Sequence, residues 1–386
     1  MDKYKVNKTY QEINKKIAAG KAVVVTAEEI IGMVEKEGVV KTAEKVDVVT
    51  TGTFAPMCSS GVFLNIGQST PTIRTTKTWL NNVPAYSGIA AVDCYLGATQ
   101  TSDDDPLNKR YPGGFEYGGG HVIQDLVAGK EITVRAESYG TDCYPNRKIE
   151  KTMVLKDFVN ATLCNPRNAY QNYNCAINKS DKIKYTYMGT LKSDMGNANY
   201  STSGELSPLF NDPYLKTIGL GTRIFLGGAQ GFVTWSGTQH KTDVDRTLDG
   251  APLTPAATLF VTGDLKEMSP EWLVGQSIRG YGVSLSVGFG IPIPILNEEM
   301  VKYTSVTDDK LFTQVLDYGH EYQQGNAKSY GKVSYAELKS GTITIKGKKI
   351  PTVPLSSMVK ARKIADKLKT WIQQGKFFLG EPQKFF

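Results

Sequence analysis

The sequence predicts a mixed fold, α/β or α+β, in one large domain over residues 1–382. Three observations support this prediction. Short runs of β-branched residues recur along the chain, segments with the apolar spacing of helices lie at both ends, and no fixed-period repeat is present. A length of 386 residues allows two or three domains of about 150 residues, or one large domain with insertions. The strand order cannot be derived from the pattern.

The N-terminal part is expected to alternate between helices and short strands. Residues 9–45 have the pattern of helix, strand and helix, and Thr26 with Glu29 forms a capping box before an apolar run. Residues 46–50 have the β-branched density of a buried strand, which leads into a loop. Residues 82–100 mix Gly and Ala with apolar residues and are predicted as a helix packed against a sheet.

The middle of the chain contains two unusual segments. Residues 101–120 are rich in Asp, Pro and Gly, which predicts a long loop of the kind that forms lids or binding loops. A short helix is expected at 121–128 and an alternating strand at 131–136. Residues 160–215 are rich in Asn and Tyr and are predicted as an irregular insertion or subdomain within the large domain.

The C-terminal part returns to regular elements. Strands are predicted at residues 223–226, 232–235, 258–261 and 283–287, and a hairpin at 342–346 and 350–353. Ser356 or Ser357 is expected to cap a basic helix that runs to Gln374 and ends before Gly375. This helix and the tail that follows occupy residues 355–386.

The charge of the chain is concentrated at one end. The whole chain has 45 Lys and Arg against 38 Asp and Glu, a net charge of +7. Residues 301–386 alone have 15 Lys and Arg against 7 Asp and Glu, a net charge of +8. Because the remainder is nearly neutral, a nucleic-acid-binding surface over the whole protein is not expected.

Neither a secretory signal nor a membrane span is recognisable. The N-terminal residues are polar, and the most apolar stretch, residues 281–296, is interrupted by Gly and Pro and is too short to cross a bilayer. We therefore expect a cytoplasmic protein whose five cysteines are free thiols.

Common cofactor and hydrolase motifs are absent. The chain has no complete phosphate-binding or dinucleotide-binding glycine pattern and no HExxH, GxSxG or CxxC motif. With three His residues, a histidine-rich metal site is not expected. The cysteines are not spaced like zinc or ferredoxin ligands, so the identity of any metal stays unknown.

Two cysteines have surroundings typical of reactive thiols. Cys58 lies in a loop bounded by Gly, Pro and Ser, and a helix starting at Ser59 or Ser60 would stabilise its thiolate. Cys143 lies in a turn followed by Arg147, and positive charge has the same effect. For both, an inert buried thiol is an equally good interpretation. The other three cysteines are predicted to be buried, Cys94 in a helix and Cys164 and Cys175 in the insertion.

Other candidate site residues have local support only. Gly118, Gly119 and Gly120 precede a helix, where backbone N–H groups could bind an anion such as a substrate carboxylate. A plain flexible turn explains them equally well. His240 is a candidate acid or base, although a hydrogen-bonded structural histidine is the better interpretation.

Several long motifs together resemble the homocysteine biosynthesis protein family. These motifs are TTGTFAPMCSSGVFLN at 50–65, WLNNVPAY at 79–86, YGGGHVI at 117–123, GTDCYP at 140–145, GTRIFLGG at 221–228, WSGTQH at 235–240 and the helix with ARKIA at 361–365. The resemblance extends from about residue 10 to 382. It implies a sulfurtransferase that inserts sulfur into L-aspartate 4-semialdehyde to give L-homocysteine. Many members continue into paired CBS domains, which are not expected here.

The resemblance also implies roles for particular residues. The two functional cysteines of the family fall on Cys143, as the persulfide carrier, and on Cys58. The matching motifs make three groups of residues candidates for substrate binding: Gly118–Gly120 with His121, Arg223, and His240.

Electron counting requires a redox partner. Conversion of the aldehyde to a thiol with sulfide takes two electrons, and a persulfide sulfur takes two more. Because the chain has no nicotinamide, flavin or ferredoxin motif, the electrons must come from elsewhere. The resemblance implies a ferredoxin-like iron–sulfur protein as the donor, and we expect the basic C-terminus to dock it. Sulfide or a persulfide donor supplies the sulfur, and a homo-oligomer is an option. The alternative is a non-catalytic sulfur-carrier or scaffold subunit, with or without a labile iron–sulfur cluster on Cys58 and Cys143.

Overall fold

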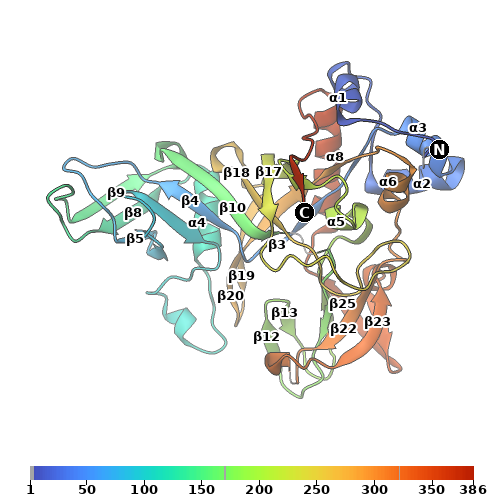
Figure 1. The fold of residues 1–386 in the computed structure, drawn as a ribbon. Coiled ribbons are helices and arrows are strands. Elements are labelled where there is room, and N and C mark those ends of the chain that lie inside the picture. The colour runs from blue at the N-terminus through green and yellow to red at the C-terminus, as the bar shows by residue number, and fades with distance from the viewer. Residues whose placement is uncertain (1–3, 169–170, 321) are drawn as a thin grey trace.

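The computed structural model describes residues 4–168, 171–320 and 322–386 of the chain (Figure 1). It confirms the mixed fold, because helices and β-sheets both contribute to the main core. In these residues the α-helices are α1 (Tyr10–Ala18), α2 (Ala27–Glu37), α3 (Val39–Lys45), α4 (Gly119–Val127), α5 (Pro208–Asn211), α6 (Glu298–Thr304), α7 (Tyr335–Lys339) and α8 (Met358–Gln373). The 3₁₀ helices are η1 (Pro106–Lys109), η2 (Leu155–Asp157), η3 (Gly204–Leu206), η4 (Leu265–Glu267) and η5 (Tyr322–Gln324).

A nine-stranded antiparallel sheet lies at the centre of the molecule. Its order is β19-β20-β16-β17-β18-β10-β4-β7, and β3 also pairs with β20. The strands are β3 (Thr53–Pro56), β4 (Gly61–Asn65), β7 (Asp93–Gly97), β10 (Asn160–Asn168), β16 (Arg223–Leu226), β17 (Ala229–Ser236), β18 (Leu259–Asp264), β19 (Leu273–Ile278) and β20 (Gly282–Gly290). All nine residues of β20 are buried because helices cover it closely. A Cβ atom at Gly290 would lie only 2.9 Å from Cγ2 of Ile364 on α8.

A small sheet, here called the arm, extends to the left of the central sheet in Figure 1. It has the order β6-β5-β8-β9. The strands are β5 (Lys77–Leu80), β6 (Val83–Ala85), β8 (Ile132–Glu137) and β9 (Lys148–Met153). The turn between β8 and β9, residues 138–147, forms the tip of the arm and carries Cys143.

A second sheet with its own core, here called the lower lobe, lies below the central sheet in Figure 1. Its order is β23-β22-β11-β14-β25-β24, beside the hairpin of β12 and β13. The strands are β11 (Cys175–Ile177), β12 (Lys184–Thr186), β13 (Gly189–Leu191), β14 (Ala198–Tyr200), β22 (Phe312–Asp317), β23 (Ser329–Ser334), β24 (Thr342–Ile345) and β25 (Lys348–Pro354). Short strands elsewhere are β1 (Val24–Thr26), β2 (Val48–Thr50), β15 (Gly219–Leu220), β21 (Pro292–Pro294) and β26 (Lys384–Phe385).

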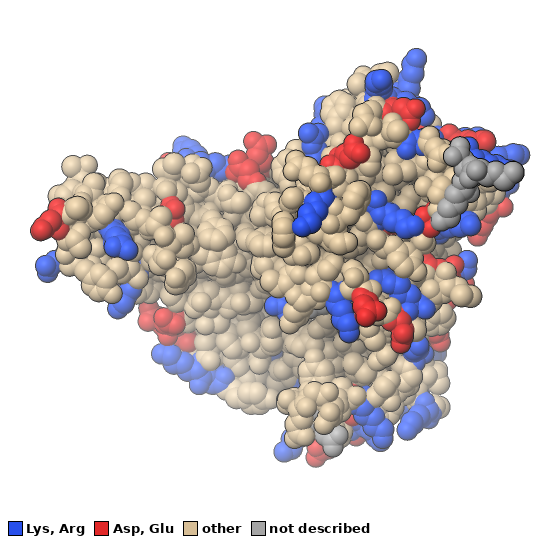
Figure 2. Space-filling view, in the orientation of Figure 1, with Lys and Arg blue, Asp and Glu red and all other residues tan. Residues whose placement is uncertain are grey.

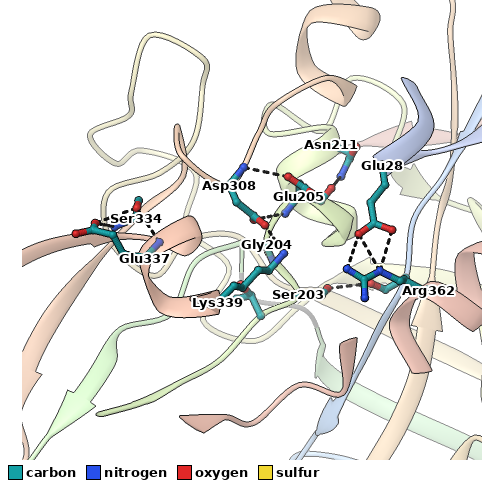
Figure 3. Close-up of polar contacts among 12 residues, drawn as sticks. Glu28, Ser203, Gly204, Glu205, Asn211, Asp308, Ser334, Glu337, Lys339 and Arg362 are labelled. Atoms are coloured by element: carbon teal, nitrogen blue, oxygen red, sulfur yellow. Dashed lines mark hydrogen bonds and ion pairs between the residues drawn. The ribbon is translucent and has the colours of Figure 1, made fainter. Parts of the chain in front are cut away.

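Carboxylates join the lower lobe to the rest of the protein (Figure 3). The N–H of Glu205 donates to Asp308 Oδ1 over 2.9 Å, and the N–H of Asp308 donates to Glu205 Oε2 over 3.1 Å. Lys339 pairs with Asp308 from the lobe side. Burial and the nearby Asp308 carboxylate raise the pKa of Glu205. These contacts hold η3, the loop before β22 and α7 together.

Predictions based on local signals are confirmed. Thr26 and Glu29 form the expected capping box of α2, and Ser357 caps α8, which ends before Gly375. The predicted strands in the C-terminal half are β16, β17, β18 and β20, and the late hairpin is formed by β24 and β25. No helix in the described ranges has the length and apolar character needed to span a bilayer.

Three predictions about local structure are wrong. Residues 82–100 are not a helix, because they form β6 and β7, and β7 pairs with β4 along its whole length. No helix follows Cys58; Ser59 and Ser60 lie in a turn that leads into β4. Residues 160–168 are not irregular, since β10 is hydrogen-bonded on both sides within the central sheet. Whether residues 160–215 are an insertion stays a prediction.

The basic face of α8 is partly neutralised within the chain. Arg362 pairs with Glu28 at 2.9 Å, as Figure 3 shows, and Lys369 pairs with Glu29 at 2.7 Å. Lys367 Nζ lies 5.5 Å from the ring centroid of Trp272. The fully solvated basic surface is therefore smaller than the charge count suggests, and docking of an electron donor there stays a prediction.

Asp47 is expected to be the most important buried charge for stability. Its carboxylate is 1% exposed and lies 3.1 Å from Lys8 Nζ and 2.7 Å from Lys16 Nζ. Burial alone would raise the pKa of Asp47, but hydrogen bonds from Lys16, the Val23 N–H and Lys8 outweigh it and lower the pKa. Asp47→Asn should therefore reduce the free energy of unfolding by about 3 kcal/mol at pH 7.

Urea denaturation of both proteins checks this prediction. Because the pKa of Asp47 is lowered in the folded state, its contribution is present above the unfolded pKa of about 4 and is lost as pH falls below it. The difference between wild type and variant should therefore shrink in acid. Glu37→Gln is the control, since Glu37 belongs to a surface pair with Lys45 and should have little effect. Equal effects of the two substitutions would contradict the prediction.

Candidate active site

A cavity of about 540 Å³ lies between the central sheet and the lower lobe and contains Cys58. Its walls come from distant parts of the chain: the turn after β3, the end of β10, the turn before β20, and the segments around β12 and after β25. The volume is in the range of small-molecule sites, about 300–1,000 Å³. Polar lining residues include Cys58, Ser59, Arg167, Tyr281 and Ser356.

Cys58 is held in the cavity by the pairing of β3 with β20. Because Pro56 pairs with Ser286, the turn that follows β3 lies beside the beginning of β20. The hydroxyl of Ser284 donates to Cys58 Sγ over 3.2 Å. Burial, the charge of Cys58 and a hydrogen bond with its sulfur raise the pKa of Tyr281. Two hydroxyl groups therefore surround this half-buried sulfur, and either can stabilise charge on it.

Tyrosines continue from Tyr281 into the lower lobe. The ring centroids of Tyr281 and Tyr187 lie 6.0 Å apart. The Tyr187 hydroxyl lies 3.0 Å from that of Tyr173 and 2.8 Å from that of Tyr318, and it also contacts Tyr322. Burial raises the pKa of both Tyr187 and Tyr318, so these phenols remain protonated. No motif in the sequence marks this cluster, and of its members only Tyr173 and Tyr187 lie in the Asn-rich and Tyr-rich segment 160–215.

Arg167 presents an unpaired donor in the cavity wall. Its Nη1 donates to Gln239 Oε1 over 2.7 Å, whereas its Nε is buried and has no partner among the described residues. The Ser356 hydroxyl is also buried, and it too has no hydrogen-bond partner among the residues that the structure describes. Ser356 is another residue of the cavity wall. Arg167 and Ser356 therefore place a cationic and a hydroxyl side chain in the cavity wall, and such groups are suited to bind a polar or anionic ligand. No motif in the sequence marks either residue.

Cys143 lies outside this cavity, at the exposed tip of the arm. The Cys143 carbonyl accepts a hydrogen bond of 2.9 Å from the Thr72 hydroxyl. Thr72 follows the C-terminal end of β4 in the chain, whereas Cys58 precedes its N-terminal end. Strand β4 alone spans about 13 Å. In Figure 1 the tip is at the left end of the molecule and β3 is in the middle. A single chain therefore does not bring Cys58 and Cys143 together, and the prediction of one shared pocket is wrong for the isolated chain.

The other three cysteines are buried, as predicted. Burial raises the pKa of Cys94 and Cys175 to about 12 and that of Cys164 to about 11. They are protonated near neutral pH and are poor nucleophiles. Cys94 is on strand β7 rather than on the expected helix.

The glycines at the start of α4 serve close packing. The N–H groups of Gly119 and Gly120 donate to the carbonyls of Gln100 and Ala98. A Cβ atom at Gly119 would lie 1.9 Å from the Gly97 carbonyl oxygen, and one at Gly120 would lie 2.0 Å from that of Ser284. The prediction of anion binding is wrong for these two residues because their N–H groups are already bonded. Gly118 is buried beside them and does not line the cavity.

The remaining sequence candidates also lie outside the cavity. The His121 ring stacks on Tyr117, and burial lowers the pKa of the His121 imidazole. His240 contacts the backbone of Thr258 through Nδ1, as a structural histidine does. Arg223 is on strand β16. None of the three lines the wall around Cys58, so their roles in substrate binding stay predictions.

A metal site is not assembled in the described ranges. They contain no group of three or more His, Cys, Asp or Glu side chains placed to hold a metal ion. An iron–sulfur cluster ligated by both Cys58 and Cys143 of one chain does not fit the separation of these residues.

Comparisons with known proteins agree closely with one another. Residues 22–379 match the family described as homocysteine biosynthesis enzyme, sulfur-incorporation. An L-aspartate semialdehyde sulfurtransferase of Methanosarcina acetivorans is 52% identical over 377 residues, which cover 98% of this chain and 71% of that protein. A protein of the same name from Methanocaldococcus jannaschii is 45% identical, over 97% of this chain and 72% of its own length. No solved structure matches the chain.

Proposed function

The chain belongs to the family of sulfur-incorporating homocysteine biosynthesis enzymes, and from this premise we propose that it inserts sulfur into L-aspartate 4-semialdehyde to give L-homocysteine. The observation that carries the proposal is the cavity lined by both Cys58 and Arg167. A thiol and a carboxylate-binding guanidinium are what a small amino-acid aldehyde requires.

We propose one orientation for the substrate in the cavity. In this orientation its α-carboxylate lies against Arg167 and Ser356, which both line the cavity. Its aldehyde end then points toward Cys58, where Tyr281 and Ser284 supply protons and hydrogen bonds. A protonated Tyr281 is a suitable acid for the oxygen that leaves the aldehyde carbon as water.

The reaction balances with an external electron donor. An aldehyde, hydrogen sulfide, two electrons and two protons give a thiol and water. When the sulfur arrives as a persulfide, two more electrons and two protons first release it from the carrier thiol. In our proposal Cys143 carries the persulfide, Cys58 receives the sulfur beside the aldehyde, and a ferredoxin-like protein supplies the electrons.

An assay of the purified chain tests the proposed function. Aspartate semialdehyde, sulfide and a low-potential chemical reductant are incubated anaerobically with the protein, and homocysteine is measured by mass spectrometry. Product should depend on protein, sulfide and reductant together. If no product forms with any sulfur source or reductant, although the folded protein still accepts sulfur on a thiol, the sulfur-carrier alternative is correct.

Arg167→Gln is expected to weaken substrate binding. Loss of a charge-assisted hydrogen bond to the carboxylate costs about 1.5–3 kcal/mol, so KM for aspartate semialdehyde should rise about 10-fold to 100-fold. The maximal rate should change much less, because Arg167 lies away from the reacting carbon. Steady-state kinetics at fixed sulfide measure both parameters.

Arg223→Gln is the comparison variant, since the family resemblance makes Arg223 a candidate for substrate binding although it lies outside the cavity. We expect its KM to equal that of the wild type. A rise in KM for the Arg223 variant and none for the Arg167 variant would show that the carboxylate binds elsewhere.

A further inference from the structure

The two thiols proposed to exchange sulfur are separated in one chain, and the tip that carries Cys143 is firmly held. The backbones of Thr141 and Tyr144 form two hydrogen bonds with each other, and the Asn146 N–H donates to the Thr72 carbonyl. The Asn146 side chain also donates to Ser69 Oγ over 3.1 Å. Movement of Cys143 alone to Cys58 of the same chain would break these contacts.

The tip has the properties of a surface that contacts another protein. Cys143 is exposed, and the neighbouring Tyr139 is 79% exposed. Residues 72–77 and 138–148, which form this end of the arm, contain four Lys and Arg against one Asp, a net charge of +3. An exposed aromatic beside a group of positive charges is typical of an interface.

A complementary surface lies beside the Cys58 cavity. Residues 101–118 contain four Asp and Glu against two Lys and Arg, a net charge of −2. This loop contacts the cavity region, since Tyr111 packs edge-on against Tyr185 and the Gly280 N–H donates to the Gly113 carbonyl. Tyr111 is 80% exposed. Figure 2 shows the molecule hollowed between the arm and the lower lobe, with few charged side chains in the hollow.

We propose that sulfur passes between two copies of this chain: the arm of one copy enters the hollow of the other and presents its Cys143 to the Cys58 cavity. This inference rests on the proposed function. A two-fold axis lets each copy give its arm and receive that of its neighbour, so that two equivalent composite sites form. The positive tip then lies against the negative loop of the second copy.

The transfer of sulfur between the copies requires no external electrons. The Cys58 thiolate attacks the outer sulfur of the Cys143 persulfide, one sulfur–sulfur bond forms, and one breaks. Cys143 leaves as a thiolate, and its former outer sulfur is now bound to Cys58. The electrons are needed only afterwards, when the sulfur is released beside the aldehyde.

Disulfide trapping tests the pairing without any assay of activity. Chains with Cys58→Ser and Cys143→Ser, each with a different affinity tag, are mixed, equilibrated and treated with a mild thiol oxidant. We expect a covalent pair that carries both tags, joined by Cys58 of one chain and Cys143 of the other, as mapped by mass spectrometry. An intrachain link between Cys58 and Cys143 in the wild type, or the absence of any Cys58–Cys143 link, overturns the proposal.

Complementation gives a second, quantitative test. A mixed dimer of the two single variants is purified by means of both tags and assayed with a persulfide donor. It has one intact composite site, formed by Cys143 of one chain and Cys58 of the other, and should show about half of the wild-type rate. A mixed dimer of the wild type and the Cys58→Ser, Cys143→Ser double variant has no intact composite site and should be nearly inactive. Exchange within one chain predicts the opposite result for both pairs. If the single variants are active by themselves, the roles assigned to the thiols fail, which is distinguishable from failure of the pairing.

Discussion

Cys58→Ser is expected to abolish homocysteine formation from a persulfide donor, with a loss of at least about a thousandfold. The serine hydroxyl is a far weaker nucleophile and cannot carry a second sulfur. The substitution changes the volume of the turn little, and Ser284 can still donate to the new oxygen, so the fold should be retained. Homocysteine measured by mass spectrometry gives the rate.

Ser284→Ala is the matched control for Cys58. It removes one hydrogen bond to the sulfur and leaves the thiol in place, so a reduction of about tenfold or less is expected. A Cys58→Ser protein with the rate of the Ser284→Ala protein would exclude a catalytic role for the thiol.

Cys143→Ser is expected to give the second largest effect, but only with a persulfide donor. Without the carrier thiol, the donor-dependent rate should fall at least about a hundredfold. High concentrations of free sulfide should still support the reaction, because Cys58, Tyr281 and Arg167 remain in the cavity. In the wild type, mass spectrometry should find one added sulfur on the peptide that contains Cys143.

The two sulfur sources separate the roles of the cysteines. A Cys143→Ser protein that is fully active with the persulfide donor would contradict the carrier role. One that is inactive even with abundant sulfide would assign Cys143 to the chemistry in the cavity. Cys94 offers no useful comparison, since it is buried in β7 and its substitution would act through stability.

Elements with local signals were predictable from the sequence, and elements defined by distant partners were not. The caps of α2 and α8 involve residues three positions apart, so the sequence contains the whole signal. Residues 82–100 were misassigned because their composition suits close packing in either a helix or a strand. Pairing of β7 with β4, decided by tertiary structure, makes them strands.

The same distinction applies to the candidate site. Cys58 was identified because its own loop has an unusual composition. Arg167, Tyr281 and Ser356 lie between about one hundred and three hundred residues further along the chain, and no spacing links them to Cys58. The sequence leaves the Gly118–Gly120 run open between anion binding and a plain turn, because a glycine that packs against backbone and one that binds an anion look alike in sequence. Only the neighbours, the carbonyls of Gly97 and Ser284, distinguish them.

The composition of the cavity wall has a consequence for biosynthesis of the enzyme. The wall includes Thr53 and Ser356, about three hundred residues apart, so the whole segment between them must leave the ribosome before the pocket can close. Contacts between such distant residues are acquired late in folding because the chain loses much entropy when it closes long loops. The wall around Cys58 is therefore expected to be completed late in folding, when the segment that carries Ser356 joins the central sheet.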